Sequence, residues 1–194
     1  MFTCGWCGVH YSEWQSQCSS CGGDLPPAGD ELGPPPPPTP RVLPRGYRVR
    51  QVWSANFNVI FGSVFFIAGT ALTVLFATVK SWVVIFPALF ALGGLSALIR
   101  GLSQARRTLR SFRSGEVAEG VFSSIAKDPM YAGQNSGGAP WIVKYTFNTG
   151  SQKCEGTFST IEDSTQALIK VGKPVWVLYV KEDPSQSTIY PPLR

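Results

Sequence analysis

The sequence predicts a membrane α-helical hairpin with a four-cysteine zinc-binding head before it and a small antiparallel, barrel-like β-domain after it. Two long apolar stretches in the middle, two Cys-x-x-Cys pairs near the start and short alternating segments in the last third predict this class. The expected segments are the head at 1–25, a proline-rich linker and juxtamembrane segment at 26–57, the transmembrane hairpin at 58–99, a basic juxtamembrane helix at 100–114 and the β-domain at 115–194.

The head contains Cys4-Gly-Trp-Cys7-Gly8 and, after ten residues, Cys18-Ser-Ser-Cys21-Gly22. Each pair turns two thiolates toward one point, and the glycine after it allows a positive φ. Four thiolates complete a tetrahedral shell that suits structural Zn²⁺ with no open position. A module of about 25 residues needs such a staple, because it buries too little apolar surface to fold alone. The head resembles the zinc ribbons found at the ends of many bacterial proteins.

An iron centre of the rubredoxin kind and redox-active or disulfide-bonded thiols are the alternatives for these cysteines. His10, the only histidine, is an alternative ligand. We expect Trp6 to form a miniature core and Trp14 to be an exposed partner-binding residue. The head has no Lys or Arg, which argues against nucleic acid as a partner, because phosphate contacts depend on these side chains.

The linker contains five consecutive prolines, Pro34 to Pro38, which favour an extended polyproline II helix. We interpret the run as a semi-rigid spacer that holds the head away from the membrane. The alternative is that it serves as a ligand for an aromatic-lined groove. Farther along, Tyr47 and Trp53 suit the headgroup level of a bilayer, because their rings have one apolar and one wet end.

Val59–Val79 and Trp82–Ile99 are 21 and 18 residues without a charge, separated by Lys80 and Ser81. About 20 residues at 1.5 Å each match a hydrocarbon core about 30 Å thick, so we expect two spanning helices joined by a tight turn. The missing internal charges argue against transport. We expect Pro87 to kink the second span. Small residues predict close packing, within the hairpin or against a partner's helix; they are Gly62, Gly69, Thr73, Gly93, Gly94, Ser96 and Ala97.

Nine arginines flank the two spans, and the net charge of +5 therefore belongs to the juxtamembrane segments. They are Arg41, Arg45, Arg48, Arg50, Arg100, Arg106, Arg107, Arg110 and Arg113. Such flanks stay in the cytoplasm, so both termini should be cytoplasmic. The start has no basic segment followed by an apolar run, which predicts no cleaved signal peptide, and the cysteines then belong to a reducing compartment. We expect Arg106, Arg107 and Arg110 to anchor the helix on anionic headgroups, or else to bind phosphate or an acidic ligand.

Past Ser114 the periodicity becomes that of strands, with a hairpin turn at Asn148-Thr-Gly150 and a long excursion at 128–140. The expected strands are 116–126, 141–147, 153–158, 175–180 and 187–190. Ser159-x-x-Glu162 has the capping-box pattern of a short helix that runs to Val171. We interpret Cys154 as a small buried hydrophobe, with a nucleophile as the minority interpretation.

These strands resemble a family of bacterial membrane proteins of unknown function that combine transmembrane helices with a small β-domain. The resemblance rests on Glu119-Gly120-Val121-Phe122, Tyr145-x-Phe147, Glu155-Gly156, Gly172-x-x-Val175-x-Val177-x-Tyr179 and Asp183-Pro184-x-x-Ser187. The long excursion and Val180-Lys181-Glu182 depart from the family pattern. The resemblance implies the architecture and a bacterial inner membrane, without any chemistry.

The functional expectation is a non-enzymatic membrane adapter that presents the ribbon and the β-domain to a protein partner on the cytoplasmic face. The sequence shows no Gly-rich phosphate loop and no recognisable carboxylate pair in the context that catalysis requires. The alternatives are an accessory structural subunit of a larger membrane complex and a metal- or ligand-responsive regulator of a membrane protein.

Overall fold

A computed structural model of the chain describes residues 2–27, 29–44, 46–53, 57–77, 82–128, 141–150, 152–160 and 169–193. The chain forms two compact units. Met1–Tyr47 and Arg110–Arg194 together make the first, called here the β unit, and Arg48–Leu109 makes the second, called here the helical unit. The cysteine head, the proline-rich linker and the β-domain therefore belong to one compact unit, although the helical unit separates them in sequence.

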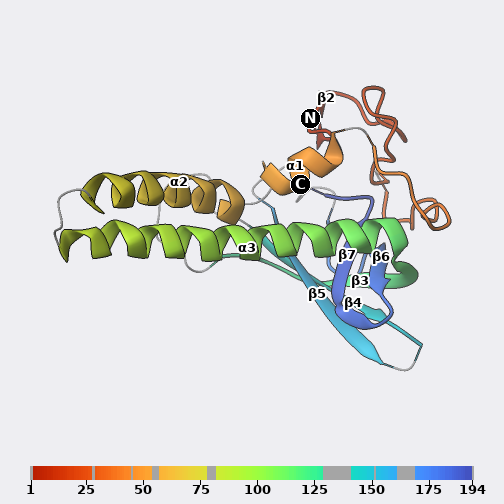
Figure 1. Cartoon of the computed structure of the whole chain (residues 1–194). Helices are drawn as coiled ribbons and strands as arrows, with labels where there is room; N and C mark the ends of the chain where they lie inside the picture. Colours follow the sequence, from red (N-terminus) through yellow and green to blue (C-terminus); the bar gives the residue numbers. More distant parts are fainter. Residues whose placement is uncertain are drawn as a thin grey trace. The chain divides into compact units, whose positions relative to one another are not determined.

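The helical unit is an antiparallel pair formed by α2 (Phe57–Ala77) and the greater part of α3 (Ile85–Ser114), which is preceded by a 3-10 turn, η1 (Trp82–Val84) (Figure 1). A short helix, α1 (Tyr47–Trp53), comes before them. Asn58–Ala77 and Trp82–Ser114 are long and apolar enough to cross a membrane by length and composition, and only 17% and 11% of their most apolar windows are buried within the chain. The expected connecting turn lies outside the described residues from 78 to 81.

The basic segment expected after the second apolar stretch continues α3 without a break to Ser114. Pro87 is the third residue of this helix. The first four N–H groups of a helix have no intrahelical acceptor, so a proline in the first turn removes no hydrogen bond. The kink at Pro87 stays a prediction, but the hydrogen-bond loss on which it rested does not occur within α3, because this helix begins only two residues before Pro87.

Glycines set the spacing between α2 and α3, as the small-residue pattern predicted. A Cβ placed on Gly94 of α3 would lie 2.4 Å from the backbone nitrogen of Phe66 on α2. One placed on Gly69 of α2 would lie 2.6 Å from the nitrogen of Ala91, and one on Gly62 would lie 2.6 Å from the nitrogen of Leu98. The interpretation that the small residues pack the hairpin against itself is confirmed at these three positions.

Gly93 and Gly94 provide a matched pair of variants for this helix contact. Gly94→Leu is expected to lower the thermal stability of the detergent-solubilised protein, at a cost of about 1–3 kcal/mol, because a side chain there overpacks against the α2 backbone. Gly93→Leu is the control, because a Cβ at Gly93 has no atom within 4 Å. Equal melting temperatures for the two variants would contradict packing through Gly94.

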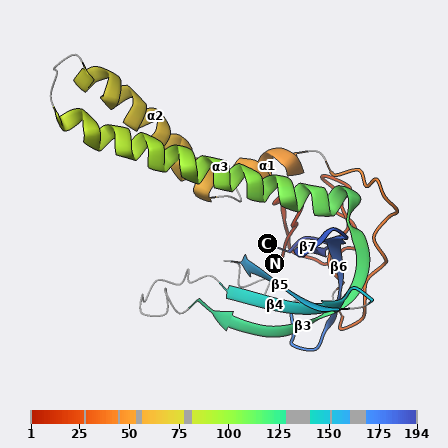
Figure 2. The same ribbon diagram turned by 60° about the horizontal axis from the view of Figure 1, so that its bottom comes forward.

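The β unit contains a five-stranded antiparallel sheet in the order β5-β4-β3-β6-β7 (Figure 2). Its strands are β3 (Glu116–Lys127), β4 (Trp141–Asn148), β5 (Lys153–Thr160), β6 (Pro174–Val180) and β7 (Asp183–Tyr190). Residues of the two edge strands, β5 and β7, come close together, so the sheet is nearly closed. All five expected strands are present, and the barrel-like expectation holds at this level.

Strand β7 begins four residues earlier than expected, at Asp183 instead of Ser187. Asp183 pairs with Val180 across a tight turn, next to a register shift between Tyr179 and Val180. The Asp183-Pro184 dipeptide looks like a turn in sequence, whereas here it starts the edge strand β7. Proline is tolerated at this position because an edge strand has no partner on one side to which its missing N–H would donate. Of the helix expected to run to Val171, residues 161–168 lie outside the described part, and Ile169–Val171 are not helical, so the helix does not extend to Val171. Of the 128–140 excursion, residues 129–140 lie outside the described part.

The core of the sheet is made by inward-facing residues at alternate strand positions. Val143, Tyr145 and Phe147 of β4 are buried, while Lys144 and Asn148 between and after them are exposed. The Tyr145 ring lies directly over Gly156 of β5, where a Cβ would lie 2.1 Å from it. Cys154 is partly buried and packs against this core, which agrees with its interpretation as a small hydrophobe.

Candidate metal centre

The two Cys-x-x-Cys turns of the head share one backbone pattern. In the first, Gly8 N–H donates to the Cys4 carbonyl at 2.8 Å and Cys4 N–H donates to the Val9 carbonyl at 2.9 Å. The second repeats this with Gly22 to Cys18 at 2.8 Å and Cys18 to Gly23 at 2.9 Å. Gly8 and Gly22 have φ values of 83° and 72°, which only glycine adopts without strain. Each turn therefore directs its two thiols to the same side.

A short backbone pairing closes each of the two turns. Strand β1 (Phe2–Thr3) pairs with β2 (His10–Tyr11) around the first turn, and a single bridge between Gln17 and Asp24 closes the second. His10 Nδ1 and the Thr3 hydroxyl share a hydrogen bond at 2.8 Å. His10 is not part of the cysteine cluster. The head is thus built from two similar loops around four sulfur atoms.

The four sulfur atoms of Cys4, Cys7, Cys18 and Cys21 all lie within 4.8 Å of one another. Sγ of Cys4 is 3.9 Å from that of Cys21, and Sγ of Cys7 is 3.5 Å from that of Cys18. Four sulfurs at about 2.3 Å from a tetrahedral Zn²⁺ are about 3.8 Å apart, so the cluster fits such an ion. It is the only group of this kind among the residues that the structure describes.

Burial and hydrogen bonding shift the pKa values of Cys4 and Cys18 in opposite directions. Burial raises the pKa of Cys4 to about 11. Burial also acts to raise the pKa of Cys18, but hydrogen bonds from the Tyr11 hydroxyl at 3.0 Å and from Cys21 N–H at 3.4 Å outweigh it and lower this pKa to about 6. Because metals bind thiolates, binding at the cluster releases protons. Tyr11 is a contributor that the cysteine spacing alone did not identify.

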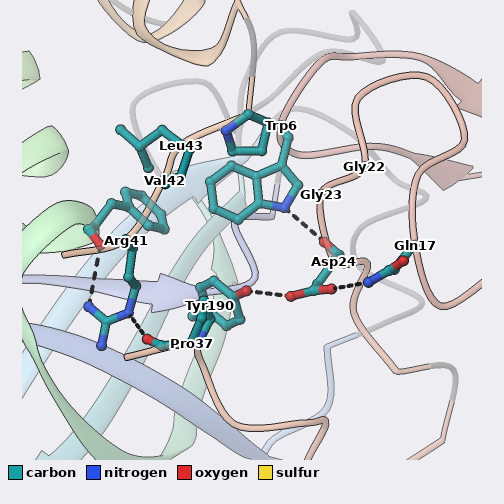
Figure 3. A pocket seen from close by; sticks show the side chains of 12 residues that line it. Trp6, Gln17, Gly22, Gly23, Asp24, Pro37, Arg41, Val42, Leu43 and Tyr190 are labelled. Atoms are coloured by element: carbon teal, nitrogen blue, oxygen red, sulfur yellow. Dashed lines mark hydrogen bonds between the residues drawn. The ribbon is translucent and has the colours of Figure 1, made fainter. Parts of the chain in front are cut away.

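Trp6, inside the first Cys-x-x-Cys turn, connects the head to the rest of the β unit. Its side chain is 3% exposed, and its ring centroid lies 4.9 Å from that of Tyr47 and 5.3 Å from that of Phe112. The Tyr190 ring lies on another side, at 5.9 Å between centroids (Figure 3). The Trp6 indole N–H donates to the Asp24 carbonyl at 2.8 Å. The prediction that Trp6 forms a core is confirmed, but this core is shared with α1, α3 and β7.

A second connection runs through Asp24, which lies three residues after Cys21. Its carboxylate accepts hydrogen bonds from the Tyr190 hydroxyl and, at 3.2 Å, from the Gln17 side-chain amide (Figure 3). Burial, and then this hydrogen bond to a carboxylate, raise the pKa of Tyr190. A third connection is made by Gly5 in the first Cys-x-x-Cys turn. A Cβ placed on Gly5 would lie 1.7 Å from the Pro192 carbonyl oxygen, so the two backbones are in contact there.

Arg41 holds the end of α3 instead of facing a membrane surface. It is 6% exposed, and its guanidinium donates to the carbonyls of Phe112 at 3.3 Å, Gly115 at 2.8 Å and Pro37 at 2.7 Å. Carbonyls at a helix C-terminus lack intrahelical donors, and a cation there also favours the helix dipole. One of the nine flanking arginines is therefore a structural cap, which its position in the sequence does not reveal.

The proline-rich linker lies against the β-domain. Lys173 Nζ donates to the Pro27 carbonyl at 3.3 Å, and the Trp176 indole N–H donates to the Gly33 carbonyl at 2.8 Å. An exposed ion pair joins Lys170 to Asp30 at 3.0 Å. The linker therefore does not act as a spacer between the parts that it joins, because side chains of Lys173, Trp176 and Arg41 bind its backbone carbonyls.

The other expected site residues lie apart from the cysteine cluster. Trp14 is 48% exposed, as expected of a partner-binding residue, and its indole N–H donates to the Pro26 carbonyl. Trp53 and the side chains of Arg106 and Arg107 are exposed, and Arg110 forms an ion pair with Glu182 at 3.4 Å. The expectation that Tyr47 lies at a headgroup level is corrected, because its ring is 3% exposed and packs on Trp6 and Phe112.

A cavity of about 220 Å³ lies beside Trp6 and is lined in part by Asp24, Arg41 and Tyr190 (Figure 3). Its polar lining groups hold one another or backbone carbonyls. We find no significant match of this chain to a protein-family model, to a curated protein or to a solved structure. The cysteine cluster is a possible metal site, as the two Cys-x-x-Cys pairs predict, and no match supports a named family.

Proposed function

We propose that the protein is a non-enzymatic membrane adapter that presents a zinc ribbon and a β-domain, joined in one unit, to a protein partner. The helical hairpin anchors it in the bacterial inner membrane, and both soluble parts face the cytoplasm. The observation that carries this proposal is the joining of the head to the β-domain through Trp6 and Asp24, which both contact Tyr190. A head held in this way offers one composite surface instead of two independent modules.

The apolar surface of the helical unit supports the membrane anchor. Large side chains on α2 and α3 are exposed, although a soluble protein rarely exposes so continuous an apolar surface. They are Ile60, Phe61, Val64, Ile67, Leu72, Val74, Leu75, Ile85, Phe86, Leu89, Phe90, Leu92 and Ile99. The orientation can be tested with a membrane-impermeant maleimide, which should label Ser81→Cys in intact cells but should not label Ser12→Cys or Ser187→Cys.

Zinc is the proposed ion, with a structural role. Four cysteine ligands leave no position for water or substrate, and in a reducing compartment such clusters bind metal more often than they form disulfides. Iron in a rubredoxin-like centre has a similar sulfur arrangement and remains the alternative. Metal analysis of the purified protein distinguishes the two.

We also propose that the protein neither catalyses a reaction nor binds nucleic acid. The one histidine, His10, hydrogen-bonds the Thr3 hydroxyl on the exposed surface of the head, and Cys154 packs against the apolar core of the sheet. The head carries no Lys or Arg for phosphate contacts. Hydrolytic activity of the purified protein, or its retention on nucleic acid at about 0.15 M salt, would contradict these parts.

A metal-responsive regulator is the second candidate, and one observation favours it. The loops that bear the cysteines also bear Gly5, Trp6 and Asp24, which contact Pro192, Tyr190 and Phe112. Loss of the metal would therefore alter contacts beyond the head. An accessory subunit that packs its hairpin in a larger membrane complex is the third candidate.

Co-purification tests the adapter function. The protein, tagged and extracted in mild detergent, should carry a stoichiometric protein partner that mass spectrometry identifies. Trp14→Ala should release this partner without changing the melting temperature, because Trp14 is exposed in the head. A partner that stays bound to Trp14→Ala and is released by Gly94→Leu would favour the structural subunit. The absence of any stoichiometric partner would contradict the adapter.

A further inference from the structure

The proline run Pro34–Pro38 lies against the β unit along one edge only. Pro36 is buried, and Gly33, three residues before it, is half-buried. The four other prolines of the run are exposed; they are Pro34, Pro35, Pro37 and Pro38. A polyproline II helix has three residues per turn, so positions three apart share an edge. The exposure pattern is that of such a helix with one edge seated and two edges facing solvent.

Side chains of the β unit hold the run near both ends. The Trp176 indole donates to the carbonyl of Gly33, directly before the first proline, at 2.8 Å. The Arg41 guanidinium donates to the carbonyl of Pro37 at 2.7 Å (Figure 3). Trp176 is on β6, whereas Arg41 is itself held by carbonyls at the end of α3. The run is therefore fixed to folded elements instead of hanging free.

The two exposed edges have the proline spacing that proline-binding domains recognise. Pro34 and Pro37 share one edge, and Pro35 and Pro38 share the other, so each edge carries a proline-x-x-proline pair. Among the described residues, no group donates a hydrogen bond to the carbonyls of Pro34 and Pro35. Domains of the SH3, WW and EVH1 kind bind such segments by packing aromatic rings on the prolines and donating to their carbonyls.

We propose that Pro34–Pro38 is a docking ligand, held ready by the fold, for a partner domain with an aromatic-lined groove. This inference names a partner class for the proposed adapter and therefore rests on that function. Because the proline rings and the two anchors restrict the run before binding, the partner meets a smaller entropy cost than it would with a free peptide. Glu31 is exposed three residues before the run and favours a basic residue beside the partner's groove.

Binding by purified probe domains tests this inference. The full-length protein in detergent is immobilised, and one SH3, one WW and one EVH1 domain are passed over it. We expect at least one domain to bind, and Pro35→Ala with Pro38→Ala to weaken it about tenfold, because both ring contacts on one edge are lost. The melting temperature should stay unchanged, since both rings face solvent. Equal binding to wild type and to this variant, including no binding to either, overturns the proposal.

Trp176→Phe tests whether the fold presents the run. It keeps every proline and removes the indole hydrogen bond to Gly33. We expect the Trp176→Phe protein to bind the same probe domain about threefold more weakly than wild type does. A synthetic peptide of residues 31–40 should bind the probe domain more weakly still. A peptide that binds as tightly as the folded protein would overturn presentation by the fold. Probe binding by a protein that carries no stoichiometric partner would instead contradict the adapter function, so the two failures are distinguishable.

Discussion

Replacement of Cys4 and Cys18 together by Ser is expected to abolish metal binding and to unfold the head. One ligand of each Cys-x-x-Cys turn is lost, and the two remaining thiols cannot complete a tetrahedral shell. The free energy of binding a structural zinc ion is about 10–16 kcal/mol at neutral pH, so loss of a bound zinc ion is expected to destabilise the head strongly. Metal analysis should give about one zinc ion per wild-type chain and none for the double variant.

Cys154→Ser is the matched control for this substitution. Cys154 is the fifth cysteine and lies in β5, away from the cluster. Its variant should keep the full metal content. Tryptophan fluorescence, to which the buried Trp6 contributes together with five other tryptophans, should change in the double variant and stay the same in the control. A metal-free double variant with wild-type fluorescence would refute a metal-dependent head.

Trp6→Ala is expected to destabilise the β unit by about 3–5 kcal/mol, which is the usual cost of truncating a buried Trp. The substitution empties the space between Tyr47, Phe112 and Tyr190 and leaves the Asp24 carbonyl without its indole donor. It also uncovers Gly23, because a Cβ there would lie 2.3 Å from the Trp6 ring. Denaturant unfolding, followed by far-UV circular dichroism, measures the loss.

Trp14→Ala is the control for Trp6→Ala. Both tryptophans belong to the head and donate their indole N–H to a backbone carbonyl, but Trp14 is 48% exposed. We expect its replacement to cost less than about 1 kcal/mol, since exposed side chains contribute little. If Trp6→Ala keeps its metal, then metal binding by the head does not depend on the packing of Trp6 against the β unit. Equal costs for the two variants would contradict the central place of Trp6.

The sequence determined those features that depend on neighbours along the chain. Runs of β-branched and aromatic residues between turn signals predicted the five strands of the large sheet, although β7 begins four residues before its predicted start. The two Cys-x-x-Cys-Gly motifs located the cluster, since each forms a local turn. Gly62, Gly69 and Gly94 predicted the contact between α2 and α3, because close backbone approach requires residues without a side chain.

Only the tertiary structure decided how these parts meet. Arg41 looked like a membrane-flanking charge, but it caps carbonyls more than 70 residues away, and Asp24 binds Tyr190 across 166 residues. Tyr47 looked like an interfacial aromatic and the linker like a spacer, yet both are held by residues distant in sequence. Composition and periodicity report how often a residue type is buried or exposed. They do not show which residues distant in sequence bury a given side chain. For Arg41, Asp24 and Tyr47 those distant residues decide the role.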